Sequence, residues 1–196
     1  MARKKRSNDG QTRPSRLVNR RILPGVEERE TLNRLLRAHD PEVAAENWSK
    51  ISAAHAPLLR QIALEGQQAG GDPAVRKHAI ALLGRFAAPE DLNALVGLAQ
   101  FDADTGVRAA ALVSLGTSGV QLAAPILAAA LASDDTVEAT AGAKALHALA
   151  DRIGADVTLA SISPGGGARV SRLVKQAFEA RAIQARGRKR SATRAD

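Results

Sequence analysis

Residues 104–116 read DTGVRAAALVSLG, and residues 72–84 read the closely similar DPAVRKHAIALLG. Both follow the pattern Asp-x-x-Val-Arg, then small and aliphatic residues, then Leu-Gly. Related starts occur at residues 40–43 and 134–137, so that the four valines are 32, 32 and 30 positions apart. A fixed period of this size predicts a stack of helical repeats, a solenoid.

Each of the four starts predicts the beginning of a helix. Asp favours the N-cap position because its carboxylate accepts the free amides of the first turn, and Pro suits the first helical residue. Apolar residues return at helical spacing after Val75 and after Val107. A second helix of each unit is predicted to open at Pro57, Pro89 and Pro125.

Small residues are abundant in the predicted helices. The chain has 41 alanines, which we interpret as packing residues because small side chains let helices approach closely and Ala has the best helix propensity. Gly84 and Gly116 occupy the same position in two repeats, near the helix end. They suit either close packing between helices or a C-terminal cap.

The units at 72–84 and 104–116 resemble the short HEAT-like repeat, the type also found in phycobilin lyases. The resemblance covers about residues 40–162 and departs from the pattern in the outer units, where Ala44 and Glu138 stand in place of Arg. It implies an all-α fold, a right-handed α-solenoid of about four HEAT-like helix pairs, and it implies no reaction. Hydrophobic periodicity adds an N-terminal helix over 26–38 and a C-terminal helix over about 168–186.

The net charge of +8 is unevenly distributed along the chain. Residues 1–21 carry +7, residues 169–196 carry +7, and residues 22–168 carry −6. Such asymmetry is typical of terminal segments that meet a polyanion. We therefore predict a basic flexible arm at 1–21, a HEAT-like repeat domain at 22–163, a hinge with a basic C-terminal helix at 164–186, and a basic tail at 187–196.

The candidate polyanion-binding residues are the basic side chains of the arm, the last helix and the tail. They are Arg3, Lys4, Lys5, Arg6, Arg169, Arg172, Lys175, Arg186, Arg188, Lys189 and Arg190.

No motif points to catalysis or to a metal. The chain has no Cys, and its four His residues lack metal-ligand spacing, so no catalytic residue, cofactor site or metal site is predicted. His78 and His147 are expected at the edge of the core. The acidic pairs 27–28, 90–91 and 134–135 lie at predicted helix starts, where capping and the helix dipole account for them.

Two functions are consistent with these patterns. The first is a non-enzymatic scaffold or adaptor that binds protein partners through a curved surface lined by the second helix of each unit, the acidic middle favouring a basic partner. The alternative is a nucleic-acid-associated protein whose basic termini contact the backbone of DNA or RNA. No small-molecule substrate is expected.

Location is predicted from what the composition lacks. Without Cys, a secretory h-region or a long apolar run, a cytoplasmic protein without membrane contact is expected. The richness in Ala, Gly and Arg is typical of a high-GC bacterial or phage genome.

Overall fold

The computed structural model describes residues 26–37, 46–65, 72–162 and 167–192, and for residues 182–192 it describes the backbone alone. The predicted helix start at 40–43 and the N-terminal arm lie outside these residues. The described helices are α1 (Val26–Leu36), η1 (Ala53–His55), α3 (Ala56–Leu64), α4 (Pro73–Phe86), α5 (Pro89–Phe101), α6 (Thr105–Ser118), η3 (Gln121–Ala123), α7 (Ala124–Leu131), α8 (Thr136–Ile153), α9 (Ala155–Ser161) and α10 (Gly167–Ala192). A further helical turn spans 46–49.

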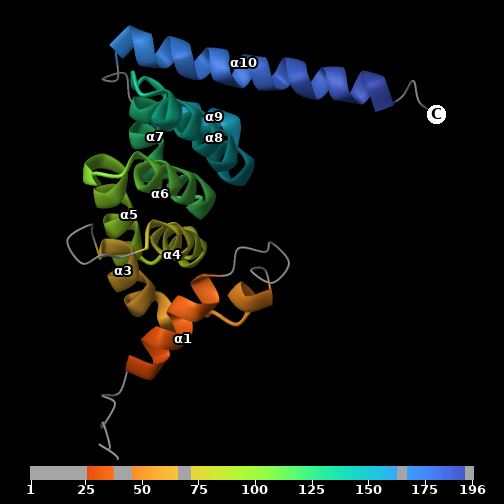
Figure 1. Ribbon diagram of the computed structural model, residues 1–196. Helices are drawn as coiled ribbons and strands as arrows, with labels where there is room; N and C mark the ends of the chain where they lie inside the picture. Colours follow the sequence, from red (N-terminus) through yellow and green to blue (C-terminus); the bar gives the residue numbers. More distant parts are fainter. Residues whose placement is uncertain (1–25, 38–45, 66–71, 163–166, 193–196) are drawn as a thin grey trace, which may run out of the picture.

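The helices form an α-solenoid, as the sequence predicts. In Figure 1, α4, α6 and α8 lie side by side in one layer, and α3, α5 and α7 form the second layer to the left of it. The core between the layers is built from leucine and alanine, with Leu59, Leu83, Leu115 and Leu146 almost fully buried. Alternating layers of this kind leave one side of α4, α6 and α8 facing outward.

The N-caps of the repeat helices confirm the role predicted for Asp. The carboxylate of Asp72 accepts the amide of Ala74 at 2.9 Å, and that of Asp104 accepts the amide of Val107 at 2.9 Å. In the fourth unit the cap is Asp135, one residue later than the repeat pattern predicts. The same unit also departs from the period, because its valine follows that of the preceding unit by 30 residues and not by 32.

Gly84 and Gly116 serve close packing and not capping. A Cβ on Gly84 would lie 2.6 Å from the carbonyl oxygen of Ser114, and a Cβ on Gly116 would lie 2.6 Å from the Cα of Ala145. The missing side chains therefore let α4 approach α6, and α6 approach α8. The left-handed C-cap positions are taken instead by Ala87 and Gly119.

Ala87 offers a stabilising substitution. Its φ of 52° lies in the left-handed region, which costs an L-residue about 1–2 kcal/mol and glycine almost nothing. Because glycine also loses more chain entropy on folding, we expect Ala87→Gly to raise the free energy of unfolding by about 0.5–1 kcal/mol. Urea denaturation of the two proteins measures the difference, and an unchanged or lowered midpoint would contradict the expectation.

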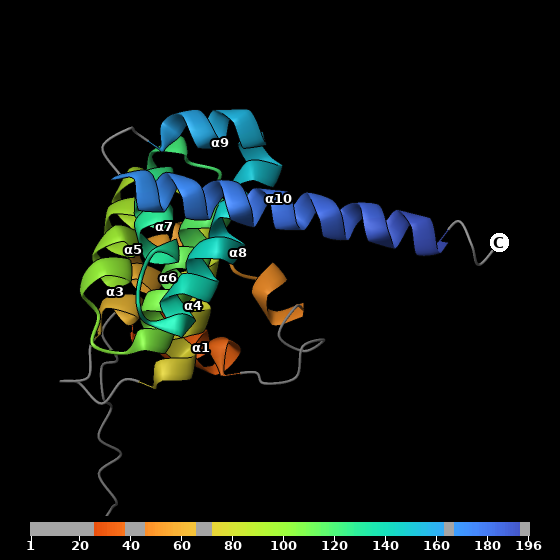
Figure 2. The same cartoon turned by 90° about the horizontal axis from the view of Figure 1, so that it is seen from above.

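Helix α10 crosses the C-terminal end of the stack over α7 and α8 and then continues past α8 (Figures 1 and 2). Val174 is buried, and Phe178 meets the ring of His147 edge-on at 5.5 Å between centroids. Arg181 pairs with Asp151 at 2.7 Å. The sequence predicted this helix to end near residue 186, whereas it runs through Gly187 to Ala192.

Candidate functional site

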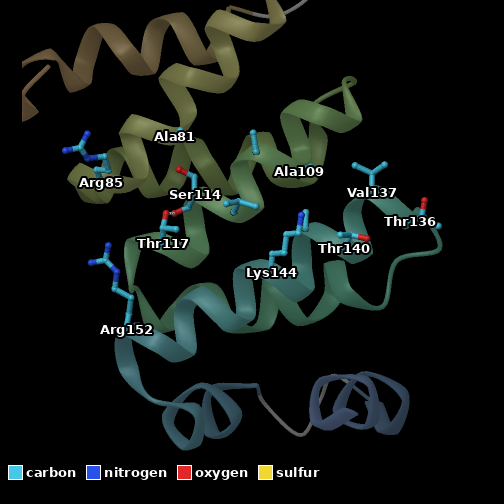
Figure 3. A pocket seen from close by; sticks show the side chains of 13 residues that line it. Ala81, Arg85, Ala109, Ser114, Thr117, Thr136, Val137, Thr140, Lys144 and Arg152 are labelled. Atoms are coloured by element: carbon cyan, nitrogen blue, oxygen red, sulfur yellow. Dashed lines mark hydrogen bonds between the residues drawn. The ribbon is translucent and has the colours of Figure 1, made fainter. Parts of the chain in front are cut away.

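The outward face of α4, α6 and α8 carries a groove of about 880 Å³, which we call the α4–α6–α8 groove. Figure 3 shows Arg85 and Arg152 at one end of it, Thr136 and Val137 at the other, and Lys144 between them. It is lined by Ala81, Arg85, Ala109, Ala110, Val113, Ser114, Thr117, Thr136, Val137, Thr140, Ala141, Lys144 and Arg152.

The floor of the groove is made of small and apolar side chains. Val113 is 37% exposed and Val137 is 49% exposed, whereas Val75 and Val107 on the same helix layer are buried. The alanines of the lining leave the backbone open to close approach. Such a surface loses water favourably when another apolar surface covers it.

The charged side chains of the groove have one sign. Arg85, Lys144 and Arg152 line it, and no Asp or Glu is among its lining residues. These three cations form no ion pair with any residue that the structure describes. The groove is therefore positive although residues 22–168 are net acidic.

The other cations of residues 56–156 are all used inside the fold. Arg60 pairs with Asp91 at 2.8 Å, and Lys77 lies 3.9 Å from Asp104. Arg76 and Arg108, the arginines of the repeat pattern, also form ion pairs. The cations of the groove thus differ from the other four, because they alone form no ion pair with a described residue.

The two pattern arginines connect neighbouring helices. Arg76 is 3% exposed, donates Nε–H to the Ala63 carbonyl at 3.0 Å, and pairs with Asp102. Arg108 donates to the carbonyl of Asp102 at 2.8 Å and pairs with Glu138. Glu138, which departs from the sequence pattern, is therefore the partner of the arginine one repeat earlier.

Asp91 corrects the interpretation of the pair at 90–91. Its side chain is fully buried and pairs with Arg60, so capping and dipole effects do not account for it. It connects the start of α5 to α3 of the preceding unit. Its Oδ2 has no hydrogen-bond partner among the described residues.

The two histidines of the repeat helices lie at the core edge and take part in packing. The Nδ1 of His78 contacts the Leu36 carbonyl oxygen, and its ring meets Trp48 at 5.1 Å. The Nε2 of His147 lies 3.2 Å from the carbonyl oxygen of Ala177 on α10. Within the described ranges, no group of three His, Cys, Asp or Glu side chains is arranged to hold a metal ion.

The predicted polyanion-binding residues fall into three sets. Arg169, Arg172 and Lys175 are exposed near the start of α10, where Arg169 lies 3.3 Å from Asp134 while Arg172 and Lys175 form no ion pair with a described residue. Arg186, Arg188, Lys189 and Arg190 have their backbone in the projecting part of α10. Arg3, Lys4, Lys5 and Arg6 lie outside the described residues.

A smaller groove of about 500 Å³ lies on the second helices α5 and α7, the face that the sequence analysis favoured. Phe101, which is 81% exposed, is among its lining residues. Glu138 also lines it but is already paired with Arg108. The α4–α6–α8 groove is larger, and its cations have no partner in the part of the chain that the structure describes, so it is the better candidate site.

Two carboxylates with lowered pKa values lie at structural positions. The Val107 amide, followed by the charge of Lys77, holds the pKa of Asp104 below its ordinary value of 3.8. The hydrogen bond from Arg181 likewise lowers the pKa of Asp151. Because the pKa is lowered in the folded state, the contribution of each carboxylate to folding stability is fully present above its ordinary pKa. That contribution is lost as the pH falls through the lowered pKa.

This titration predicts an acid-sensitive cap on α6. Asp104→Asn keeps a capping side chain but removes the charge that titrates. We expect the variant to lose less of its free energy of unfolding between pH 5 and pH 2 than the parent protein does. Urea denaturation across that pH range measures this, and parallel curves would show that Asp104 contributes nothing to the acid dependence.

Sequence reasoning did not identify Arg85, Lys144, Arg152, Val113 or Val137 as site residues. A signal for two of them was present, because Arg85 and Lys144 have no acidic residue three or four positions away on their own helices.

No helix of the described residues is long and apolar enough to cross a bilayer.

Comparison with known proteins supports the architecture. The family model for HEAT repeats matches residues 56–156, more than half of the chain. The match begins at the first residue of α3 and ends within α9. No curated protein sequence matches this chain. With its stacked helix pairs, its capped repeat starts and this match, the chain belongs to the HEAT repeat family.

Proposed function

We propose that this protein is a non-catalytic adaptor that binds a protein partner in the α4–α6–α8 groove. The observation that carries this proposal is the groove itself, where exposed Val113 and Val137 share the lining with cations that form no ion pair among the described residues. Solenoid proteins use extended surfaces of this kind for binding. Two of the four histidines, His78 and His147, have their rings packed against aromatic side chains, which favours a structural role for them over acid–base catalysis.

Site-specific cross-linking tests the proposal. A photoreactive residue replaces Val113 in the full chain, and a matched control carries it at Leu122, which is 84% exposed and outside the groove lining. We expect a discrete adduct, identified by mass spectrometry, from position 113 in extracts of the source cells. A second protein with the probe at 113 and Val137→Asp should lose that adduct. Equal adducts from both positions, or none from 113, would overturn the proposal.

A second candidate function is contact with a nucleic acid through α10. The continuity of this helix to Ala192 favours it, because the helix register places positions 172, 175, 186 and 190 on one face that does not include Val174. Basic side chains at these positions would follow a phosphate backbone and release counterions on binding. The basic arm at 1–21 supplies a second charged segment of the same kind.

Salt-dependent binding tests this second function. Fluorescence anisotropy with duplex DNA and with RNA compares the full chain with a variant carrying Glu at 172, 175, 186 and 190. A control carries Glu at 3, 4, 5 and 6, the same charge change in the arm. We expect the α10 variant to bind more weakly and with a shallower salt slope. No binding at about 50 mM salt, where phosphate contacts are strongest, would eliminate this function.

A further inference from the structure

The three cations of the groove have no ion-pair partner within the described fold. Arg85 comes from α4, and Lys144 and Arg152 come from α8, so two separate repeats supply the positive charge. Seven Lys and Arg side chains occur in residues 56–156, and the three that form no ion pair with a described residue are the three that line the groove. The fold thus neutralises its cations everywhere in the repeats except on this surface.

The chain's own termini do not match the groove. Residues 1–21 and 169–196 each carry a net charge of +7, and they would bring like charge next to Arg85, Lys144 and Arg152. Like charges placed side by side at an interface cost binding free energy. A partner with the opposite charge is required, and the net acidity of the repeats does not alter this because those carboxylates lie outside the groove lining.

The apolar floor sets a second requirement. Val113 and Val137 line the same groove as the three cations and gain by being covered, while the alanines of the lining leave room for an occupant to approach the helix backbones. Highly charged polymers such as nucleic acids offer phosphate to the cations but have no aliphatic side chains for the valines. A protein segment that alternates carboxylates with aliphatic side chains satisfies both requirements.

We infer that the occupant of the α4–α6–α8 groove is an acidic segment of a partner protein, with aliphatic side chains on Val113 and Val137 and carboxylates on Arg85, Lys144 and Arg152. This inference rests on the proposed adaptor function and names the chemistry of the partner. It reverses the expectation, drawn from net charge alone, that the acidic middle of the chain selects a basic partner.

Binding of defined peptides tests the inference. Four fluorescent peptides of equal length are titrated with the full chain: one alternating Glu and Leu or Val, the same peptide with Lys for Glu, the same with Gln for Glu, and one with Glu but Gly and Ser for the aliphatic residues. We expect the first peptide to bind most tightly, at least about tenfold better than the other three, and to weaken as salt is raised.

Matched variants assign the effect to the groove. Arg85→Gln, Lys144→Gln and Arg152→Gln are combined, and the control combines Arg34→Gln, Arg37→Gln and Lys50→Gln, which remove the same charge from exposed positions outside the groove lining. Unfolding midpoints establish that both variants are folded. We expect the groove variant to lose most of the affinity for the acidic, aliphatic peptide and the control to retain it.

The outcomes separate the inference from the adaptor proposal. Equal binding of the Glu and Gln peptides, or equal affinity of the two triple variants, overturns the acidic partner and leaves the adaptor proposal standing if Val113→Asp still abolishes binding. Preference for the Lys peptide overturns the inference directly. If the chain dimerises in sedimentation and the groove variant is monomeric, a second copy is the occupant and the inference fails. Failure of every peptide, together with no adduct from position 113, overturns both.

Discussion

Replacing Gly116 by Val is expected to leave the protein largely unfolded at room temperature. A Cβ at this position would lie 2.6 Å from the Cα of Ala145 and would also collide with the Ala145 carbonyl oxygen. Both atoms belong to the backbone of α8, so no side-chain rotation relieves the clash. Overpacking of a core costs about 1–3 kcal/mol and sometimes more, and here two helices must separate. Gly116→Ala is expected to cost about 3 kcal/mol by the same mechanism.

The matched control for Gly116→Ala is Gly97→Ala. Gly97 lies inside α5, and a Cβ there would meet nothing within 4 Å. Because alanine is the better helix former, this change is expected to stabilise the protein by about 0.5–1 kcal/mol. Urea denaturation followed by circular dichroism measures both variants. Shifts of the same sign at positions 97 and 116 would contradict the close approach of α6 and α8.

Loss of the Arg76 side chain is expected to have the second large effect. Arg76→Met keeps the length of the side chain but removes the charge beside Asp102 and the hydrogen bond to the Ala63 carbonyl. The Asp102 side chain is 10% exposed and is left without its cation. Breaking a buried ion pair in this way costs about 3–5 kcal/mol.

Arg85→Met is the matched control, because it makes the same chemical change at an exposed arginine without an ion pair among the described residues. We expect it to change the free energy of unfolding by less than about 0.5 kcal/mol. The double variant Arg76→Met with Asp102→Asn should recover part of the loss, since the buried charge is gone. Equal unfolding midpoints for the two methionine variants would show that the buried pair does not stabilise the fold.

Local patterns predicted much of this architecture. The caps Asp72 and Asp104 and the helices opened by Pro57, Pro89 and Pro125 follow from residues near one another in sequence. For Gly84 and Gly116 the sequence left close packing and capping open, and the structure shows close packing. The predicted end of α10, near residue 186, is wrong. Glycine is a poor helix former, so Gly187 favours an earlier end, but the Arg and Lys residues around it are good helix formers and the helix continues to Ala192.

Pairs of residues one repeat apart could not be predicted in the same way. In the sequence, Glu138 only departs from the repeat pattern by replacing Arg, and its ion pair with Arg108 appears only in the structure. Asp91 was interpreted as a residue that complements the helix dipole, whereas it is buried in an ion pair with Arg60. The groove was missed for a related reason. Net charge averages over all faces of a domain, whereas Arg85 and Lys144 gather on one face because α4, α6 and α8 lie side by side.

The arginine contacts described above run without a break from α3 to α8. Ala63 accepts from Arg76, Arg76 pairs with Asp102, Asp102 accepts from Arg108 through its carbonyl oxygen, and Arg108 pairs with Glu138. Repeat arrays obtain their cooperativity from coupling between nearest neighbours. A polar chain that passes through every repeat boundary in this span raises the cost of opening one unit alone. We therefore expect α4, α6 and α8, the helices that line the groove, to keep a fixed spacing until the units unfold together.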